Sequence, residues 1–361
     1  MGLMFPEDLA AWQRWQRNRH VLRRVRGLLR RPSLGGPLTL HRRGADPVVL
    51  FALDATTPTA LASVIEPLAH LGDTPVAVLA PADVSAHLPG SWTTTSVPDS
   101  EAPPAGLRAV RAVVSAGHFL PVGHTAYGWA TSLGARHVVV QHGLLTPFMA
   151  PLAQGSHVLA FSDDDAEFWR SGRADTTSQT VGSQLLWKAA GRSSSDGADA
   201  DPASSRVARS TTGSSSDALP VFLGQLHGAE LSRRISAATA TSFCRETGAL
   251  YRPHPAEVDR ISRWQHARWQ RGGIRFAPPG PLAASSGPVV SIFSTGVLEA
   301  AASGRDAWVT CVEPPAWVRE FWQRYRLNEW GSDPTPAPVR PAVEPAKAIA
   351  DAVLALAEGA S

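Results

Sequence analysis

The sequence has little that would support disulfides, a metal centre or a membrane span. Its 361 residues include only two cysteines, Cys244 and Cys311, which are far apart and match no zinc-ligand spacing. No apolar run approaches the ~18 residues that a spanning helix needs, and Met1 to Ala10 contains no apolar signal core. We therefore expect a cytoplasmic protein in a reducing compartment, without a bound metal.

Several catalytic signatures are also missing. The sequence contains no Walker A loop, no nucleophile elbow, no paired-carboxylate motif and no HExxH. The dinucleotide fingerprint GxGxxG is absent after the first expected strand, which counts against an NAD enzyme. The low charged fraction of 18% and the hydrophobic fraction of 43% indicate a folded chain with real cores.

Acidic residues are missing from one segment, Arg14 to Arg31, which is rich in arginine although the net charge is only +3. Residues 1–36 are expected to contain a basic amphipathic helix, whose apolar side comprises Leu9, Trp12, Val21, Leu22, Val25, Leu28 and Leu29. Such a helix can pack on its own domain, lie on an anionic membrane surface or bind RNA. No RNP motif accompanies it, so nucleic acid is not an expected partner.

Short apolar runs then alternate with helical segments. Strands are expected at 47–53, 75–80, 107–115, 135–140 and 158–161. Helices are expected at 57–71, where Thr57 and Pro58 suit the first turn, and from Ser162 to about Arg170. The alternation predicts a parallel sheet that is covered on both faces.

The same pattern resumes after a Ser-, Gly- and Asp-rich segment, 191–218, which we interpret as a flexible linker or loop. Strands follow at 219–223, 249–251, 274–276, 289–292 and 307–312, with helices at 230–246, 257–271, 295–302 and 344–358. The expected fold is α/β, with two Rossmann-like, doubly wound parallel-sheet domains, 37–190 and 219–335, facing a cleft. A Pro-rich stretch would let the C-terminal helix in 336–361 pack back on the first domain.

Ligands of open parallel sheets bind at the carboxyl ends of the strands. After the expected strand 289–292 come Ser294, Thr295 and Gly296 at a helix start, where two hydroxyls and free N–H groups favour a phosphate site. Glu299, one turn inside the helix, is placed to accept hydrogen bonds from ribose. An ordinary Ser/Thr helix cap would give the same pattern.

Two more loops follow strands of the second domain. In Tyr251 to Pro255, two prolines fix the backbone around His254, and Arg252 supplies a bidentate phosphate donor. In Gly224 to Gly228, the turn at His227 and Gly228 would let the backbone approach a phosphate. A structural histidine is the alternative interpretation of His254.

In the first domain, His142 and Gly143 follow the expected strand 135–140, and a histidine of near-neutral pKa suits a general base. Other candidates that follow strands are His118, His124 and Asp54. A helix-capping or backbone-bound histidine is the alternative interpretation of His142.

Taken in order, these segments resemble GT-B glycosyltransferases, and among them the group of CDP-glycerol glycerophosphotransferases and capsule polymerases. The resemblance covers roughly residues 110–312 and rests on His142-Gly143, on Arg252 to Pro255, and on Ser291 to Thr295. Two positions differ from that group: Gln141 stands where it usually has Trp, and the stretch 182–186 lacks its Arg and Asp. UDP-N-acetylglucosamine 2-epimerases share parts of the same layout.

This resemblance implies a transferase that moves a glycosyl or glycerophosphoryl group from a nucleotide-diphosphate donor to a cell-surface polymer or lipid-linked acceptor. His142 would be the acceptor-side base, and Glu299 would hold the ribose. The donor diphosphate would be held without a metal by Arg252, His254, Ser294 and Thr295, and no cofactor is expected. The basic N-terminal helix would bring the enzyme to the inner membrane face. A 2-epimerase-like enzyme and a non-catalytic relative remain alternatives.

Overall fold

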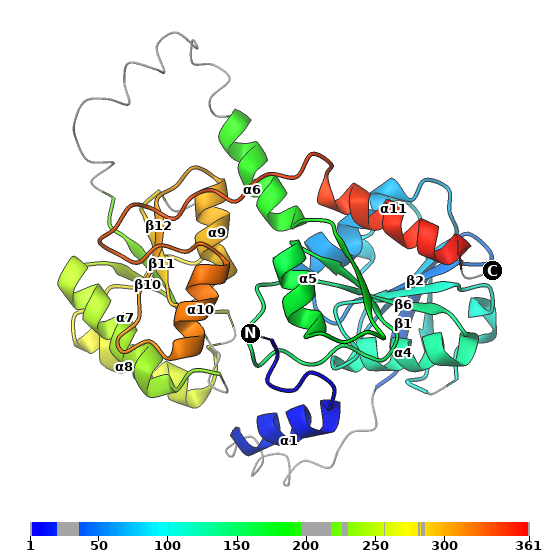
Figure 1. Ribbon diagram of the computed structural model, residues 1–361, viewed down its shortest axis with the longest axis horizontal. Coiled ribbons are helices and arrows are strands. Elements are labelled where there is room, and N and C mark those ends of the chain that lie inside the picture. The colour runs from blue at the N-terminus through cyan, green and yellow to red at the C-terminus, as the bar shows by residue number, and fades with distance from the viewer. Residues whose placement is uncertain are drawn as a thin grey trace. The chain divides into compact units, whose positions relative to one another are not determined.

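The chain forms two compact α/β units in the computed structural model, which describes residues 2–19, 36–100, 102–195, 218–225, 230–255, 257–280, 282 and 286–359. The first unit comprises Met1–Leu185 and Pro341–Ser361, and the second comprises Leu186–Arg340 (Figure 1). The chain thus enters the second unit within helix α6 (Gln184–Ser195). Residues 191–195 of the expected linker are helical, because the apolar helical spacing continues from Leu185 through the fully buried Ala189.

The first unit is built on an eight-stranded sheet in the order β4-β1-β3-β2-β5-β6-β7-β8. All neighbours from β3 to β8 are parallel, while β1 pairs antiparallel with β3 and β4. The strands are β1 (Leu38–Arg43), β2 (Val49–Ala52), β3 (Val76–Ala80), β4 (Thr93–Val97), β5 (Ala112–Ser115), β6 (Arg136–Val140), β7 (His157–Ala160) and β8 (Thr177–Thr180). Strands β2, β3 and β5 are buried throughout, as expected of strands with both faces covered.

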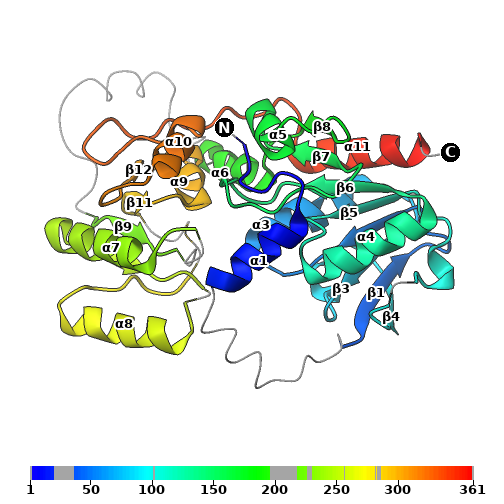
Figure 2. The ribbon, with the colours of Figure 1, turned by 60° about the horizontal axis from the view of Figure 1, so that its bottom comes forward.

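Helices cover both faces of this sheet, with α4 (Pro121–Leu133) and α11 (Pro345–Glu358) on opposite sides (Figure 2). Ile349 and Val353 of α11 join the core that contains Phe51, so the C-terminal helix packs on the first unit. Trp129 of α4 is fully buried in the core of the other face. Helix α5 (Asp163–Arg170) begins at Ser162, whose hydroxyl accepts the N–H of Asp165.

The expected helix 57–71 forms with irregular winding: α3 (Pro58–Ala60), a π-helical turn (Leu61–Ile65) and a 3₁₀ turn (Glu66–His70). Thr57 caps it as expected. Pro67 has no N–H, so it cannot continue the α-helical bonding pattern at that point.

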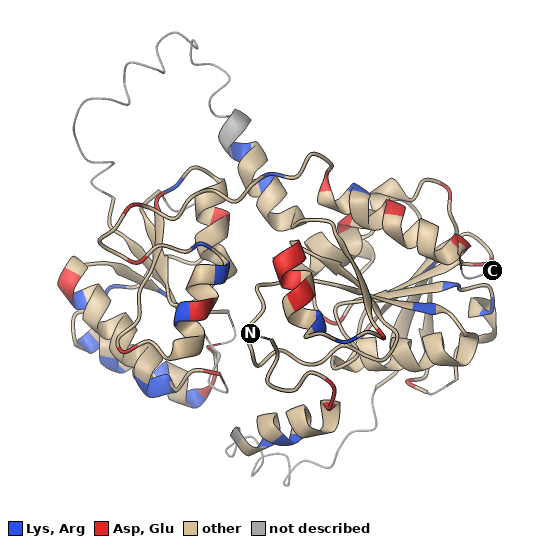
Figure 3. Ribbon diagram, in the orientation of Figure 1, with Lys and Arg blue, Asp and Glu red and all other residues tan. Residues whose placement is uncertain are grey.

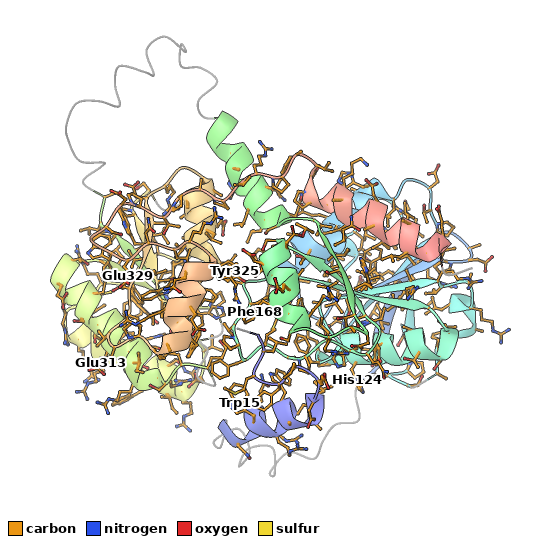
Figure 4. The ribbon with its side chains drawn as sticks, in the orientation of Figure 1. Trp15, His124, Phe168, Glu313, Tyr325 and Glu329 are labelled. Atoms are coloured by element: carbon orange, nitrogen blue, oxygen red, sulfur yellow. The ribbon has the colours of Figure 1, made fainter. Side chains whose placement is uncertain are left out.

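The N-terminal helix α1 (Leu9–Arg19) packs on its own unit. The Trp12 indole donates to the Phe148 carbonyl at 2.8 Å, and Trp15 stacks on the Phe148 ring with centroids 5.1 Å apart. Trp15 points from α1 toward the rest of the unit (Figure 4). The sequence left three roles open for this helix: packing on its own domain, membrane binding and RNA binding. In the described residues it packs on its own domain. Residues 20–35 lie outside the described residues.

The second unit has a four-stranded, fully parallel sheet in the order β10-β9-β11-β12. Its strands are β9 (Val221–Leu223), β10 (Leu250–Arg252), β11 (Val289–Ser291) and β12 (Ala307–Val309). Its other helices are α7 (Arg233–Thr247), α8 (Arg260–Arg271), α9 (Thr295–Ala302) and α10 (Ala316–Arg324). The Ser232 and Asp259 side chains cap α7 and α8, so both helices begin later than the apolar pattern alone predicts.

Several expected strands are shorter or absent. Residues 107–111 precede β5 as a turn, and the expected strand 274–276 makes only one bridge, between Phe276 and Tyr251. The strand expected at 307–312 ends at Val309. Strand β1, with its polar His41-Arg42-Arg43 end, and the exposed Thr-rich β4 were not predicted, because neither is a continuous apolar run.

Candidate functional site

The turn between β11 and α9 is tied together by its own hydroxyls. Ser294 is the N-cap, and its Oγ accepts the Gly296 N–H at 3.1 Å. The fully buried Ser291 supplies an Oγ that accepts the Ser294 N–H at 3.0 Å. Ser294 is therefore a helix cap, as the alternative interpretation of the sequence proposed. The N-terminus of α9 at Thr295 and Gly296 is partly exposed.

The loops after β9, β10 and β11 meet at one edge of the second sheet. The Gln225 amide oxygen accepts the Phe293 N–H at 2.9 Å, and the Gly224 N–H donates to the Arg252 carbonyl at 2.7 Å. A Cβ at Gly224 would lie 2.3 Å from the Tyr251 hydroxyl, and one at Gly296 would lie 2.6 Å from Leu223. Both glycines therefore allow approaches that a larger residue would prevent.

The Arg-Pro-His-Pro loop is held by Glu257, which sequence reasoning missed. The Tyr251 hydroxyl donates to both Glu257 carboxylate oxygens, and His266 Nε2 lies 2.7 Å from one of them. The His254 backbone N–H also donates to Glu257, at 3.3 Å, while its ring is exposed. Burial, with the Glu257 charge beside it, raises the pKa of Tyr251, so this hydroxyl stays protonated. No motif marks Glu257 in the sequence.

Arginines gather around Glu299. Arg192 of α6 lies 3.4 Å from its carboxylate, and Arg252 and Arg305 act on it electrostatically. Burial raises the pKa of Glu299, and the three arginines oppose that shift. Arg252 donates to the Gly280 carbonyl and Arg305 to that of Gly287. Sequence reasoning found Arg252 and Glu299 but not Arg192 or Arg305, whose positions depend on tertiary packing.

This cluster has more positive than negative charge around α9, as a diphosphate-binding edge would need. Two expected contacts, His227 and Gly228, lie outside the described residues. A cavity of about 40 Å³, with room for about three waters, lies between α7, α8 and the strand ends.

In the first unit, the loop at His142 is fixed by the fully buried Gln141. The Gln141 amide nitrogen donates to the Gly143 carbonyl at 2.9 Å and to Asp165 at 2.8 Å. Its amide oxygen accepts the Phe161 N–H at 2.8 Å. Gln141 thus joins the end of β6 to the start of α5, which explains a polar amide at the position before His-Gly.

His142 is buried enough to stay neutral. Burial lowers its pKa, and its Nδ1 has no hydrogen-bond partner among the described residues. A neutral imidazole can accept a proton from a hydroxyl group, but the buried Nδ1 is closed to a substrate, so this role falls to Nε2. The environment of His142 therefore suits a general base.

His118 occupies the matching position after the neighbouring strand. Ser115 of β5 pairs with Val139 of β6, and the two histidines each come three residues later. The His118 ring is 7% exposed, and its Nδ1 also has no partner among the described residues. Burial, with His124 and Arg173 nearby, lowers the pKa of His118 to about 4.

Asp54 has a structural task. Its two carboxylate oxygens accept the N–H groups of Val122 and Gly123 at 2.7 and 3.1 Å, which caps α4. Burial raises its pKa against these hydrogen bonds. Nearby, His124 is exposed on α4 (Figure 4). Asp54 follows β2 as expected, but its oxygens are already occupied.

The described part of the chain has neither a metal-binding cluster nor a membrane-spanning helix. No group of three or more His, Cys, Asp or Glu residues there could hold a metal ion. No helix of that part is both long and apolar enough to cross a membrane. Both cysteines are free thiols, and burial raises the pKa of Cys244 to about 11.

No family model and no curated protein sequence matches the chain. Among solved structures, it is similar to the UDP-GlcNAc 2-epimerase of Methanocaldococcus jannaschii, in complex with UDP-GlcNAc and UDP, with a TM-score of 0.51 and 11% identity over 85% of this chain and 99% of that one. A glycosyltransferase of Rickettsia africae has a TM-score of 0.40 and 11% identity, over 88% and 94% of the two chains. An O-GlcNAc transferase mutant of Thermobaculum terrenum has a TM-score of 0.41 and 13% identity, over 88% and 63%.

At these sequence identities the similarity concerns the fold alone. The fold assignment rests on the epimerase structure, whose TM-score is 0.51. Together with one mainly parallel and one fully parallel sheet, it shows a GT-B-type fold made of two Rossmann-like units.

Proposed function

We propose that this chain is a cytoplasmic GT-B-type transferase. It takes a glycosyl or glycerophosphoryl group from a nucleotide-diphosphate donor and passes it to a hydroxyl of a cell-surface polymer or lipid-linked acceptor. The observation that carries the proposal is the arginine cluster around α9, at the edge where the loops after β9, β10 and β11 meet. The epimerase whose fold the chain shares was solved in complex with a nucleotide sugar, UDP-GlcNAc.

The donor diphosphate would lie at the N-terminus of α9. The N-terminus of α9 supplies the positive end of the helix dipole, and the diphosphate would take the place of the Ser294 hydroxyl as acceptor of the Gly296 N–H. Arg252 supplies the guanidinium charge there, and the exposed His254 ring adds a donor. These groups would neutralise the leaving diphosphate without a metal. His227 and Gly228 are proposed as further donor contacts.

Glu299 would hold the ribose hydroxyls. In the structure its carboxylate is paired with Arg192 at 3.4 Å, in a contact where about half of the Arg192 side chain is exposed. Donor binding would therefore exchange this pair for contacts with ribose. The arginine released in this way would be available to the diphosphate.

The first unit would bind the acceptor, with His142 as its base. The neutral imidazole takes the proton of the acceptor hydroxyl while that oxygen bonds to the transferred carbon or phosphorus. When a glycosyl group is transferred, the bond from its carbon to the diphosphate breaks, and the nucleoside diphosphate leaves with the electron pair. When a glycerophosphoryl group is transferred, the bond between the two phosphates breaks, and the nucleoside monophosphate leaves with the electron pair. His118, at the matching position, would position the acceptor through a second hydroxyl.

A 2-epimerase reaction has less support, because it needs acidic groups that can move a proton at a sugar carbon. Asp54 caps α4, Asp163 accepts a hydrogen bond from Thr180, and Asp165 is bound by Gln141. Of Asp54 and the run Asp163 to Asp165, three acids are thus engaged in structural hydrogen bonds, and the fourth, Asp164, is exposed in the first turn of α5. This observation favours group transfer.

Arg252→Ala tests the donor site. Because a hydrogen bond to a charged group contributes about 1.5–3 kcal/mol, this change should weaken nucleoside-diphosphate binding by roughly 10- to 100-fold. The measurement is isothermal titration calorimetry with CDP, UDP and GDP, after a thermal-shift screen of CDP-, UDP-, GDP- and CMP-linked donors. The exposed Arg108→Ala is the matched control and should bind like the wild type. Equal affinity of Arg252→Ala and wild type would refute the proposed donor site.

His142→Ala separates binding from chemistry. It should leave nucleotide affinity unchanged, because His142 belongs to the other unit, and it should abolish donor turnover. Donor turnover at the wild-type rate in this variant would remove His142 from the mechanism.

A further inference from the structure

Helix α8 exposes large apolar side chains on an arginine-rich surface. Trp264 is 60% exposed, Ile261 is 44% exposed, and Val258, just before the helix, is 70% exposed. Ile261 and Trp264 are three residues apart and so share one side of α8, and Val258 lies just before its first turn. Exposed apolar residues that cluster in this way mark an interaction surface.

The charge of this surface has one sign. The helix has four arginines, all exposed, and no acidic residue: Arg260, Arg263, Arg268 and Arg271. They are spaced along α8 (Figure 3). The two acids that precede the helix are engaged elsewhere, since Asp259 pairs with Arg233 at 3.1 Å and Glu257 is buried against Tyr251 and His266.

The opposite side of α8 already holds the helix in place. Trp269 and Ser262 are buried, and the Trp269 ring packs edge-on against Tyr251 at 4.9 Å. The exposed stripe is therefore not needed to attach α8 to its sheet. Arg268 lies over the Trp264 ring at 5.8 Å, which keeps the indole beside a positive charge.

Helix α1 lacks these properties in its described part, although its sequence also combines tryptophan and arginine. Its Trp12 is buried and its Trp15 is stacked on Phe148. Of these two helices, only α8 has in its described residues a tryptophan, Trp264, that is largely exposed to solvent.

We propose that the exposed side of α8, together with Val258, docks on an anionic lipid surface. The guanidinium groups would contact lipid phosphates, while Trp264 and Ile261 would enter the headgroup region, where an amphipathic indole is favoured. Aliphatic Val258 and Ile261 favour lipid over nucleic acid, because a single-strand site needs aromatic platforms along a basic groove. This surface is independent of the donor site and of the proposed reaction.

Vesicle cosedimentation of the full chain tests the proposal. The protein should bind vesicles of phosphatidylcholine and phosphatidylglycerol more tightly than vesicles of pure phosphatidylcholine, and added salt should weaken binding. Each arginine near an anionic surface contributes about fivefold in affinity. The double variant Arg263→Glu and Arg268→Glu should therefore lose at least about 25-fold.

The matched control is Arg108→Glu with Arg136→Glu, which makes the same change in net charge at exposed positions of the first unit. It should bind vesicles nearly as the wild type does. Trp264→Phe should lower the quenching of tryptophan fluorescence by brominated lipids. Circular dichroism melts show whether each variant is folded.

Three results would overturn the proposal. The first is equal vesicle binding by the α8 variant and the wild type, and the second is equal binding to both kinds of vesicle. The third is loss of binding to single-stranded poly(U) in the α8 variant while vesicle binding stays intact.

Discussion

Gln141→Leu tests whether the buried amide holds the His142 loop. The substitution roughly keeps side-chain volume but removes three hydrogen bonds of 2.8–2.9 Å: those to Gly143, to Asp165 and from Phe161. Each buried polar group left without a partner costs about 1–3 kcal/mol. Three fully buried groups would cost about 3–9 kcal/mol, but Gly143 and Phe161 are only half-buried. The free energy of unfolding should therefore fall by roughly 3–6 kcal/mol, a large part of the total for a typical domain.

Gln184→Leu provides a matched control. Gln184 also makes three side-chain hydrogen bonds, but two go to the carboxylates of Glu66 and Glu344, and the Glu344 side chain is 36% exposed. Water can solvate an exposed carboxylate, so we expect a loss roughly half as large. Urea unfolding followed by tryptophan fluorescence measures both variants. A loss under about 1 kcal/mol for Gln141→Leu, or a larger loss for the control, would refute the role of Gln141.

Three other predictions concern the first unit. Burial holds the pKa of His118 at about 4 and that of His137 at about 3, whereas a histidine in the unfolded chain has a pKa of about 6.5. The free energy of unfolding should therefore be highest above pH 6.5 and should fall by about 2 kcal/mol per ring by about pH 5. His137→Gln should remove the His137 part of this fall, as measured by urea titrations above pH 6.5 and at about pH 5. Asp54→Ala should cost about 2 kcal/mol in thermal melts by uncapping α4, and an unchanged melt would contradict this. Trp15→Ala should speed amide exchange in residues 9–19, and unaltered exchange would argue against docking through Phe148.

The α/β fold could be predicted from the sequence because strands such as β2 and β3 are uninterrupted apolar runs, which only a sheet covered on both faces can bury. Strands β1 and β4 could not, because His41 is polar although fully buried, and four of the five β4 residues are exposed. Their pairing depends on the neighbouring strand β3 and on each other rather than on their own pattern.

The candidate site was predictable where a residue lies at the end of a strand, as Arg252 does, or just after one, as Ser294 and His142 do. It was not predictable where long-range packing decides. Arg192 reaches Glu299 from a helix more than 100 positions away, and Glu257 anchors the His254 loop without any motif. Asp54 shows the reverse case, since a residue in the right place proved to be a helix cap.

Hydrogen–deuterium exchange of the full chain with and without a saturating nucleoside diphosphate tests the central claim most directly. The account predicts slower exchange in two segments of the second unit, 252–255 and 294–299. Arg252→Ala should lose that protection while Arg108→Ala keeps it. Nucleotide-dependent protection confined to the first unit, or located in the second unit away from both segments, would contradict the account.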